Sequence, residues 1–336
     1  MATVAAGAPA APRGLARRVA GSPWAGYLAR RLGGVAAVLA FLVVVTFMIV
    51  RLVPGDPARQ IGGLTAGEEE VRQVRERLGL TEPLWRQFAS YLGGLAHGDF
   101  GTSFTTGQPV SSMLSQRLPL TILLATSALV VVLAVAIPLG TAVGVAQQRG
   151  RARAATSSFG VGASVLGAVP EYVAGTLLVF VFALTLRWLP VQGGAGFTSM
   201  ILPALSIAIA PAAVLTRLVR NETATVLSQD YITMAMSKRL SSTRLFLRHV
   251  LPNVVTSTLT LGGLILVALL GGTVVAENVF NMPGIGSEIV RAIVKRDYPE
   301  VQGIILVLGL VAVLINLIVD VTLGLLDPRV LTGTRS

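Results

Sequence analysis

The chain consists of long apolar runs separated by shorter polar stretches. A helix of about 18–20 apolar residues is long enough to cross the roughly 30 Å hydrocarbon core of a bilayer. The second and third runs are long enough to tilt or kink, because Pro138 and Pro170 lie within them. The pattern predicts an all-α polytopic membrane protein with six transmembrane helices. The predicted spans are Leu32–Val50, Leu118–Ala146, Ser158–Leu186, Met200–Val219, Val254–Ala276 and Val301–Leu325.

The polar stretch between the first two spans is predicted to form a helical loop. Thr65 and Glu68 have the spacing of a capping box at the start of one helix. Pro83 suits the first position of a second helix, in which apolar residues follow helical spacing. Those residues are Leu84, Phe88, Tyr91, Leu92 and Leu95. The loop is either a docking or gating subdomain or a solvated cap over the helix ends, and the sequence favours neither.

A second polar stretch, "DYITMAMSKRLSSTRLFLRHVLPN", separates the fourth and fifth apolar runs and extends from Asp230 to Asn253. Tyr231, Met234 and Ala235 follow the i, i+3, i+4 spacing of one helical face. The pattern therefore predicts a short helix with one apolar face at the start of this stretch.

The second half of the same stretch predicts another short helix. Ser241 and Ser242 can cap it, and Pro252 is expected to end it. A hairpin of two such helices is too short to be stable alone. It either lies in the lipid interface as an amphipathic anchor or fits a groove on a cytosolic partner, and the residues alone leave both open.

Composition agrees with a membrane protein. Of 336 residues, 53% are hydrophobic and 13% are charged, and the mean hydropathy is +0.74. Soluble domains carry about 25% charged residues. The net charge of +11 could suggest nucleic-acid binding, but the distribution of the basic residues along the chain gives it a different meaning.

Arginine and lysine are concentrated on one side of the predicted spans. The side that holds both termini carries 16 basic residues and three acidic residues, Glu222, Asp230 and Asp327. The opposite side carries 11 of each sign. Cytoplasmic loops are enriched in Lys and Arg, so the termini and the 230–253 stretch are expected to face the cytoplasm of a bacterial inner membrane. The positive charge is therefore a topology signal, and nucleic-acid binding is not expected.

The sequence offers no signature of catalysis or of a resident cofactor. It has no cysteine, and its two histidines, His97 and His249, are far apart, so no metal site is expected. A phosphate-binding P-loop needs a Gly-Lys pair, but the two lysines, Lys238 and Lys295, follow Ser and Val. The usual zinc and serine hydrolase motifs are also absent. We do not expect the chain to be an enzyme.

Three polar residues within the predicted spans are candidate intramembrane sites. Glu171 follows Pro170 and can contact a substrate or support a helix kink, with equal weight for each. Asn316 and Asp320 are four residues apart, so they share one helix face. They can belong to a proton relay, although a tie between helices near the cytoplasmic end is favoured.

Several segments in order resemble one family of proteins. The 230–253 stretch resembles the EAA-type cytoplasmic loop of permease subunits in ATP-binding cassette importers. The whole chain, from about residue 27 to 330, is similar to the first-permease branch of the dipeptide/oligopeptide/nickel permease family. The segments that carry the resemblance are "RLVPGDPA", "LGLTEPLWRQFASYLGGLAHGDFGTSF", "RLPLTILLATSAL", "LRWLPVQG", "VVAENVFNMPGIGSEIVRAIVKRDYPEVQG" and "NLIVDVTLGLLDPRV".

The resemblance implies the type I importer permease fold and a set of partners. A second, similar permease would complete a heterodimer around the translocation pathway, and an external solute-binding protein would deliver the substrate. Two cytosolic ATPase subunits would bind ATP and Mg²⁺ and dock on the 230–253 stretch. Peptides, either dipeptides or oligopeptides, are the expected substrates.

The resemblance also assigns roles to individual residues. The helix from Asp230 to Lys238 would couple the permease to the ATPases. Tyr231, Met234 and Ala235 would enter a groove on the ATPase. The side chains expected at the rim of that groove, or at the turn that follows the helix, are Lys238, Arg239 and Arg244.

One residue departs from the family pattern. Arg239 stands where glycine is usual, and a non-glycine residue in a left-handed turn costs about 1–2 kcal/mol. Either the turn has a different geometry here or Arg239 makes a compensating contact with the partner.

Together these inferences divide the chain into five parts and define two alternative functions. The parts are a disordered cytoplasmic segment 1–26, a first transmembrane helix 27–53, an external helical loop 54–116, a permease core 117–327 containing the coupling loop 220–253, and a cytoplasmic tail 328–336. The leading hypothesis is an importer permease. The alternatives are an ion-coupled secondary transporter that uses Glu171 and Asp320, and a membrane scaffold.

Overall fold

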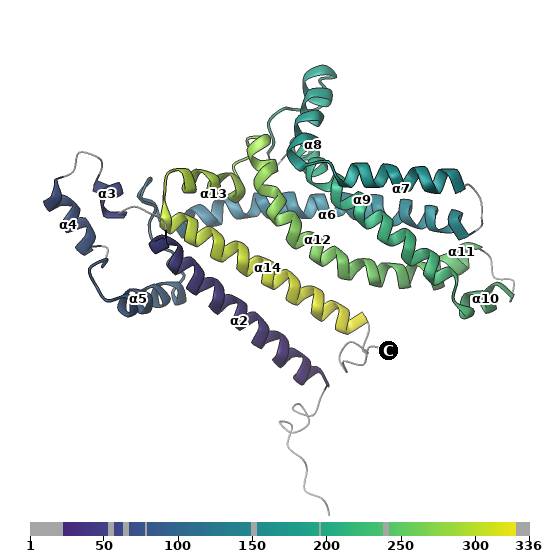
Figure 1. The fold of residues 1–336 in the computed structure, drawn as a ribbon, viewed down its shortest axis with the longest axis horizontal. Coiled ribbons are helices and arrows are strands. Elements are labelled where there is room, and N and C mark those ends of the chain that lie inside the picture. Colours follow the sequence, from purple (N-terminus) through teal and green to yellow (C-terminus); the bar gives the residue numbers. More distant parts are fainter. Residues whose placement is uncertain are drawn as a thin grey trace, which may run out of the picture.

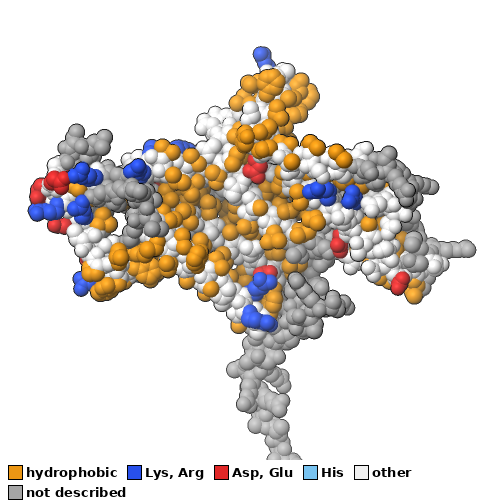
Figure 2. Space-filling model, viewed as in Figure 1, with side chains coloured by type: hydrophobic (Ala, Val, Ile, Leu, Met, Phe, Trp, Pro, Cys, Tyr) orange, Lys and Arg blue, Asp and Glu red, His pale blue; other side chains and the backbone are white. Residues whose placement is uncertain are grey.

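The computed structural model describes residues 23–52, 57–62, 67–77, 79–148, 153–194, 196–237 and 242–326. Among these residues the secondary structure is helical, apart from one isolated bridge between Thr102 and Pro109. The long helices lie side by side, with the loop helices gathered at the two ends of the bundle (Figure 1). Apolar side chains cover much of the surface between these ends (Figure 2).

Among the described residues, five unbroken helices are long and apolar enough to cross a membrane, and a bent pair of helices gives a sixth when the pair is counted as one span. This agrees with the six predicted spans. Most helices extend beyond the predicted apolar runs, because a helix can continue past the hydrocarbon core into loops. The five are α2 (Pro23–Leu52), α6 (Val110–Gln148), α9 (Phe197–Leu227), α12 (Leu251–Val279) and α14 (Tyr298–Leu326).

The third predicted span is bent rather than continuous. It consists of α7 (Arg153–Gly167), α8 (Glu171–Leu178) and the π-helix η1 (Val179–Thr185), with a bend of 96° between α7 and α8. Pro170 is the N-cap of α8, and a proline disfavours helical geometry at the residue before it. By contrast, Pro138 lies within α6, which continues without a break.

The centre of the bundle is the contact between α6 and α9, whose backbones approach closely at two glycines. A β-carbon at Gly140 would lie 2.7 Å from the carbonyl oxygen of Thr216, and one at Gly144 would lie 2.8 Å from that of Arg220. No side chain fits at either position, so these glycines allow the two helices to pack. Helix α12 packs against this pair, and α14 lies between α12 and α2 (Figure 1).

The loop between the first two spans contains α3 (Pro57–Gly62), α4 (Glu68–Arg77) and α5 (Leu84–Ala96). Helices α4 and α5 were predicted, whereas α3 was not. Thr65, the first residue of the predicted capping box, lies outside the described residues. The N-cap of α5 is Pro83, one position before the predicted one.

Helix α5 is fastened to the end of α2 by aromatic side chains. The ring of Phe47 lies 5.0 Å from that of Phe88 and 5.7 Å from that of Tyr91. The Tyr91 hydroxyl is also hydrogen-bonded to Thr46 Oγ1 at 3.2 Å. Burial raises the pKa of Tyr91, so the phenol stays neutral. Leu84 and Leu92, on the predicted apolar face, remain exposed.

The remaining helices are short and lie near the ends of the spans. Helix α10 (Asp230–Ser237) is followed by α11 (Ser242–Leu245) and the π-helix η2 (Phe246–Val250). The prediction that the second segment ends near Pro252 is wrong, because η2 runs directly into α12 and Pro252 lies in the first turn of that helix. Helix α13 (Ile285–Val294), which was not predicted, lies between α12 and α14.

Candidate functional site

Helix α10 lies at the end of α9 and presents two different faces. Ile232 is fully buried, and Ala235 is 9% exposed. Tyr231 and Met234, in contrast, are 45% and 63% exposed. The prediction that Ala235 shares an outward apolar face with Tyr231 and Met234 is therefore wrong. In so short a helix, the rotation of the helix about its own axis decides which apolar residues are buried.

The buried face of α10 joins the central apolar core. Ile232 and Ala235 belong to the same buried cluster as Leu245 of α11 and Val250 of η2. This cluster continues into α9 and α12, so apolar contacts attach the whole segment to two spans. A displacement of α10 would therefore be transmitted to both helices.

Asn253 connects α10 to the start of α12 by polar contacts. Asn253 Nδ2 donates a hydrogen bond to the Tyr231 hydroxyl at 3.3 Å and another to the carbonyl oxygen of His249 at 2.7 Å. Asp230 begins α10, where a negative charge is favourable next to the positive end of the helix dipole. The sequence reasoning missed both Ile232 and Asn253.

The predicted basic residues of the segment are only partly described. The side chains of Arg244 and Arg248 are exposed. Lys238 and Arg239 lie outside the described residues, and so does the turn at which Arg239 replaces the usual glycine. The segment therefore exposes two arginines as well as the apolar side chains of Tyr231 and Met234.

Glu171 lies at the start of α8, immediately after the bend. Its carboxylate packs against α12, since a β-carbon at Gly272 would lie 2.9 Å from Glu171 Oε1. Gly272 thus leaves room for the carboxylate between the helices. The side chain is half-buried at the bend, which fits both alternatives left open by the sequence.

Asp320 links two helices at the opposite edge of the bundle. Its carboxylate pairs with Arg31 of α2 at 2.7 Å, and its carbonyl oxygen accepts a hydrogen bond from the Tyr27 hydroxyl at 3.0 Å. Asn316 lines a cleft of about 280 Å³ beside the same arginine. This is the geometry expected of a tie between helices. Glu171 contacts a different helix pair, so the structure does not bring the two carboxylates into one relay.

A buried polar network at the other end of the bundle was missed by the sequence reasoning. The Glu277 carboxylate, at the end of α12, is fully buried. It accepts hydrogen bonds from Thr121 Oγ1 at 2.6 Å and from the backbone nitrogen of Ser287 at 2.9 Å. Thr121 Oγ1 in turn accepts the backbone N–H of Ile285 at 2.9 Å. Glu277 therefore ties α12, α6 and the start of α13 together.

The position of the Glu277 carboxylate explains the two glycines of the segment "NMPGIG", residues 281–286. A β-carbon at Gly284 would lie 2.3 Å from Glu277 Oε2, and one at Gly286 would lie 2.6 Å from the Cα of Val274. Glycine is needed at both positions, because the chain passes directly over the buried acid and the α12 backbone.

A second buried carboxylate fastens the loop that precedes α6. Asp297 Oδ2 accepts hydrogen bonds from Ser103 Oγ at 2.6 Å and from the backbone nitrogen of Thr105 at 2.9 Å. Its Oδ1 lies 3.4 Å from the backbone nitrogen of Glu300, as expected for an N-cap of α14. The sequence signal was available, since Asp297 and Glu300 have the spacing of a capping box.

An ion pair links α13 to the start of α6. Arg117 Nη1 lies 2.9 Å from Glu288 Oε2, and both side chains are largely buried. Arg291 of α13 lies 3.6 Å from the same oxygen. The end of the bundle that carries α5 and α13 therefore combines three polar connections between segments distant in sequence.

Comparison with known proteins places these features in a family. Residues 136–332 match the family described as "Binding-protein-dependent transport system inner membrane component", and residues 25–125 match its N-terminal region. A relative from Sinorhizobium fredii, named "Probable peptide ABC transporter permease protein y4tP", is 39% identical over 90% of this chain and 98% of its own length. The glutathione transport system permease protein GsiC of Salmonella paratyphi A is 38% identical, with the same coverage of both chains.

Proposed function

The chain belongs to the family of binding-protein-dependent transport system inner membrane components, and we propose that it forms half of the translocation pathway of an ATP-driven peptide importer. The transport role comes from the family, and the peptide substrate is inferred from the relatives named for peptide and glutathione transport. Glutathione is itself a small peptide, so both names favour a binding site for short peptides.

The proposed assembly contains partners that supply what this chain lacks. A second permease would complete the pathway, and an external solute-binding protein would deliver the peptide, as the family description suggests. Two ATPase subunits would bind ATP and Mg²⁺ on the cytoplasmic side, so the chain itself is not an enzyme. The absence of a P-loop from the sequence supports this division of labour.

The two-faced geometry of α10 is the observation that carries the proposed coupling mechanism. Tyr231 and Met234 are exposed and can enter a groove on an ATPase, while Ile232 is buried against the spans. ATP binding would move the ATPases together, and α10 would pass that movement to α9 and α12. The spans would then change between inward-open and outward-open arrangements.

The proposed orientation places both termini and α10 in the cytoplasm. The excess of arginine on that side supports it, since 16 of the 27 basic residues lie there. In this orientation α5, α13 and the buried carboxylates Glu277 and Asp297 lie at the external end. An ion-coupled transporter is the weaker alternative, because Asp320 is paired with Arg31 and Glu171 contacts another helix.

A double substitution on α10 tests the coupling mechanism. Tyr231→Asp with Met234→Asp replaces two exposed apolar side chains, so the chain should insert and fold normally. We expect at least a tenfold loss of ATPase subunits that co-purify with the permease, and a similar loss of ATP-dependent peptide uptake in proteoliposomes. Ala235 is left unchanged because a charge at this buried position would destabilise the chain itself.

The matched control makes the same change at the other end of the molecule. Leu84→Asp with Leu92→Asp on α5 introduces two carboxylates on another exposed helix. ATPase association should stay within twofold of wild type in this variant. Normal association and uptake in the α10 variant would contradict the coupling role, and uptake driven by an ion gradient without ATPases would favour the secondary transporter.

A further inference from the structure

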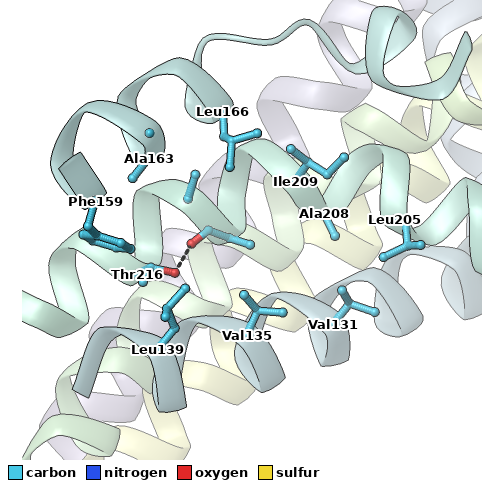
Figure 3. A pocket seen from close by; sticks show the side chains of 13 residues that line it. Val131, Val135, Leu139, Phe159, Ala163, Leu166, Leu205, Ala208, Ile209 and Thr216 are labelled. Carbon is cyan, nitrogen blue, oxygen red and sulfur yellow. Dashed lines mark hydrogen bonds between the residues drawn. The ribbon is translucent and has the colours of Figure 1, made fainter. Parts of the chain in front are cut away.

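An apolar groove of about 390 Å³ lies between α6, α7 and α9. Figure 3 shows side chains from all three helices pointing into it. Its walls include Val131 and Leu139 of α6, Phe159 and Leu166 of α7, and Leu205 and Ile209 of α9. The bend at Pro170 separates α7 from α8, and α7 packs against α9.

The groove is open next to Gly162 of α7. A β-carbon added at this position would meet no atom within 4 Å. Ala208 and Ala212 of α9 are also small and line the groove. This contrasts with Gly140 on α6, where the absent side chain is replaced by direct contact with α9. The α6–α9 contact is tight, whereas the approach of α7 to the same pair leaves a gap.

The groove has no polar group available for a ligand. Thr216 contributes the single hydroxyl on its walls, and this group donates a hydrogen bond to the Ala212 carbonyl oxygen at 2.5 Å. A peptide or an ion would lose its hydration there without replacement, which is unfavourable by several kcal/mol per polar group. A hydrocarbon chain would lose nothing and would fill space that is otherwise costly to leave empty.

Two arginines follow Thr216 on α9 and reach α7 beside the groove. Arg217 Nη1 donates a hydrogen bond to Ser164 Oγ of α7 at 3.1 Å, so this cation lies at the contact between α7 and α9. Arg220 donates to Asn221 Oδ1, and its Nη1 lies 3.9 Å from the position of a β-carbon at Gly160 of α7. Both hydrogen bonds go to neutral oxygens, so neither bond neutralises its guanidinium. An apolar groove with two cations beside it matches the chemistry of an anionic lipid.

We propose that this groove binds one acyl chain of an anionic phospholipid, with the lipid phosphate at Arg217 and Arg220. Guanidinium groups are suited to phosphate, and the cytoplasmic leaflet is the one enriched in anionic lipid. The leaflet assignment rests on the proposed orientation, whereas the binding site itself does not.

A single lipid chain is thin and flexible enough to follow a slot between three helices. The lipid would act as a wedge between α7 and the α6–α9 pair.

Native mass spectrometry of the full chain, released from nanodiscs with equal amounts of phosphatidylglycerol and phosphatidylcholine, tests the proposal. Wild type should retain phosphatidylglycerol in preference to phosphatidylcholine. Gly162→Leu, which fills the groove, should lower retained lipid at least tenfold. Val161→Leu changes the neighbouring exposed residue on α7 and should have no effect.

The double variant Arg217→Gln with Arg220→Gln tests the contact with the lipid headgroup separately from the contact with the acyl chain. This variant should still retain lipid but lose the preference for phosphatidylglycerol at least fivefold. Equal lipid retention by wild type and Gly162→Leu would overturn the proposal. So would cross-linking of a cysteine introduced at position 162 to the second permease in the assembled complex, because the groove would then be a protein interface.

Discussion

In the proposed orientation, the external end of the bundle, which carries α5 and α13, is joined by buried carboxylates, whereas the cytoplasmic segment at α10 is attached by apolar side chains. Glu277 and Asp297 are fully buried, and each accepts hydrogen bonds from segments far away in sequence. Ile232 and Ala235 attach α10 through a buried apolar cluster, whose contacts are not directional. Hydrogen bonds require one geometry, but apolar contacts tolerate small shifts.

This difference suits the two ends to different tasks. A network of buried charges is destabilised strongly by any partial separation, so the external loops and α13 should move as one unit. Apolar packing tolerates small changes in the angle of α10 while the buried contacts with α9 and α12 persist, so a displacement of α10 is still passed to both helices.

The largest effect is expected from removing the buried acid at the external end. Glu277→Ala leaves the Thr121 hydroxyl and the Ser287 N–H without their acceptor in a dry site. The free energy of unfolding should fall by about 2–6 kcal/mol, because each buried donor left without an acceptor costs about 1–3 kcal/mol. Thermal unfolding of the purified chain in detergent measures this. Glu277→Gln keeps one acceptor oxygen and should lose about 1–2 kcal/mol, and equal melting of the Ala variant and wild type would refute the network.

The second effect concerns the loop fastened to α14. Asp297→Ala removes the acceptor of Ser103 Oγ and of the Thr105 N–H, and it also removes the N-cap of α14. Together these losses should destabilise the chain by about 2–4 kcal/mol. Hydrogen exchange of residues 99–109 should accelerate more than exchange at α10.

Ser103→Ala is the matched control for that loop. It removes the hydroxyl that donates to Asp297 and accepts the Thr106 N–H, while Asp297 still accepts the Thr105 N–H. The expected loss is about 1–2 kcal/mol. If the two variants are equally stable, Asp297 does not hold the loop in the way the distances indicate.

The third effect concerns the buried face of α10. Ile232→Ala creates a cavity under α10 and should cost about 2 kcal/mol, the low end for such a substitution, because α10 lies at the margin of the bundle. Hydrogen exchange of residues 230–237 should increase locally, with little change at α13. Met234→Ala, at an exposed position, should change stability by less than about 0.5 kcal/mol. Similar exchange in both variants would show that α10 does not depend on its buried face.

The arrangement of spans could be predicted from hydropathy because membrane thickness fixes helix length. The bend at Pro170 was a possible kink in the sequence, but its 96° angle depends on how α7 packs against α9. That packing involves residues distant in sequence, so no local signal determines it. The same reason explains why Glu277 was missed, since its partner Thr121 lies 156 residues away.

The faces of α10 were assigned incorrectly for a different reason. The helix is short, and apolar residues occur on both sides of it, so the i, i+3, i+4 rule fits more than one face. The exposed pair Tyr231 and Met234 was among the predicted contact residues, but the buried anchor Ile232 was not. In a segment of eight residues, the core to which it attaches decides the orientation.

The smallest effect is expected at the Tyr231 hydroxyl. It tests most directly whether α10 depends on apolar contacts or on a hydrogen bond. Tyr231→Phe removes only the hydrogen bond from Asn253 Nδ2, which is long at 3.3 Å and partly exposed. Water can replace an exposed partner, so stability should change by less than about 0.5 kcal/mol, and peptide uptake should stay near wild type. A thermal melt and an uptake assay on the same preparation provide the measurement. A large loss of uptake with unchanged melting would mean that the hydroxyl makes a directional contact with the ATPase. Coupling at α10 would then depend on a directional hydrogen bond, as the packing of the external end does. The two ends would no longer differ in the kind of contact on which they depend.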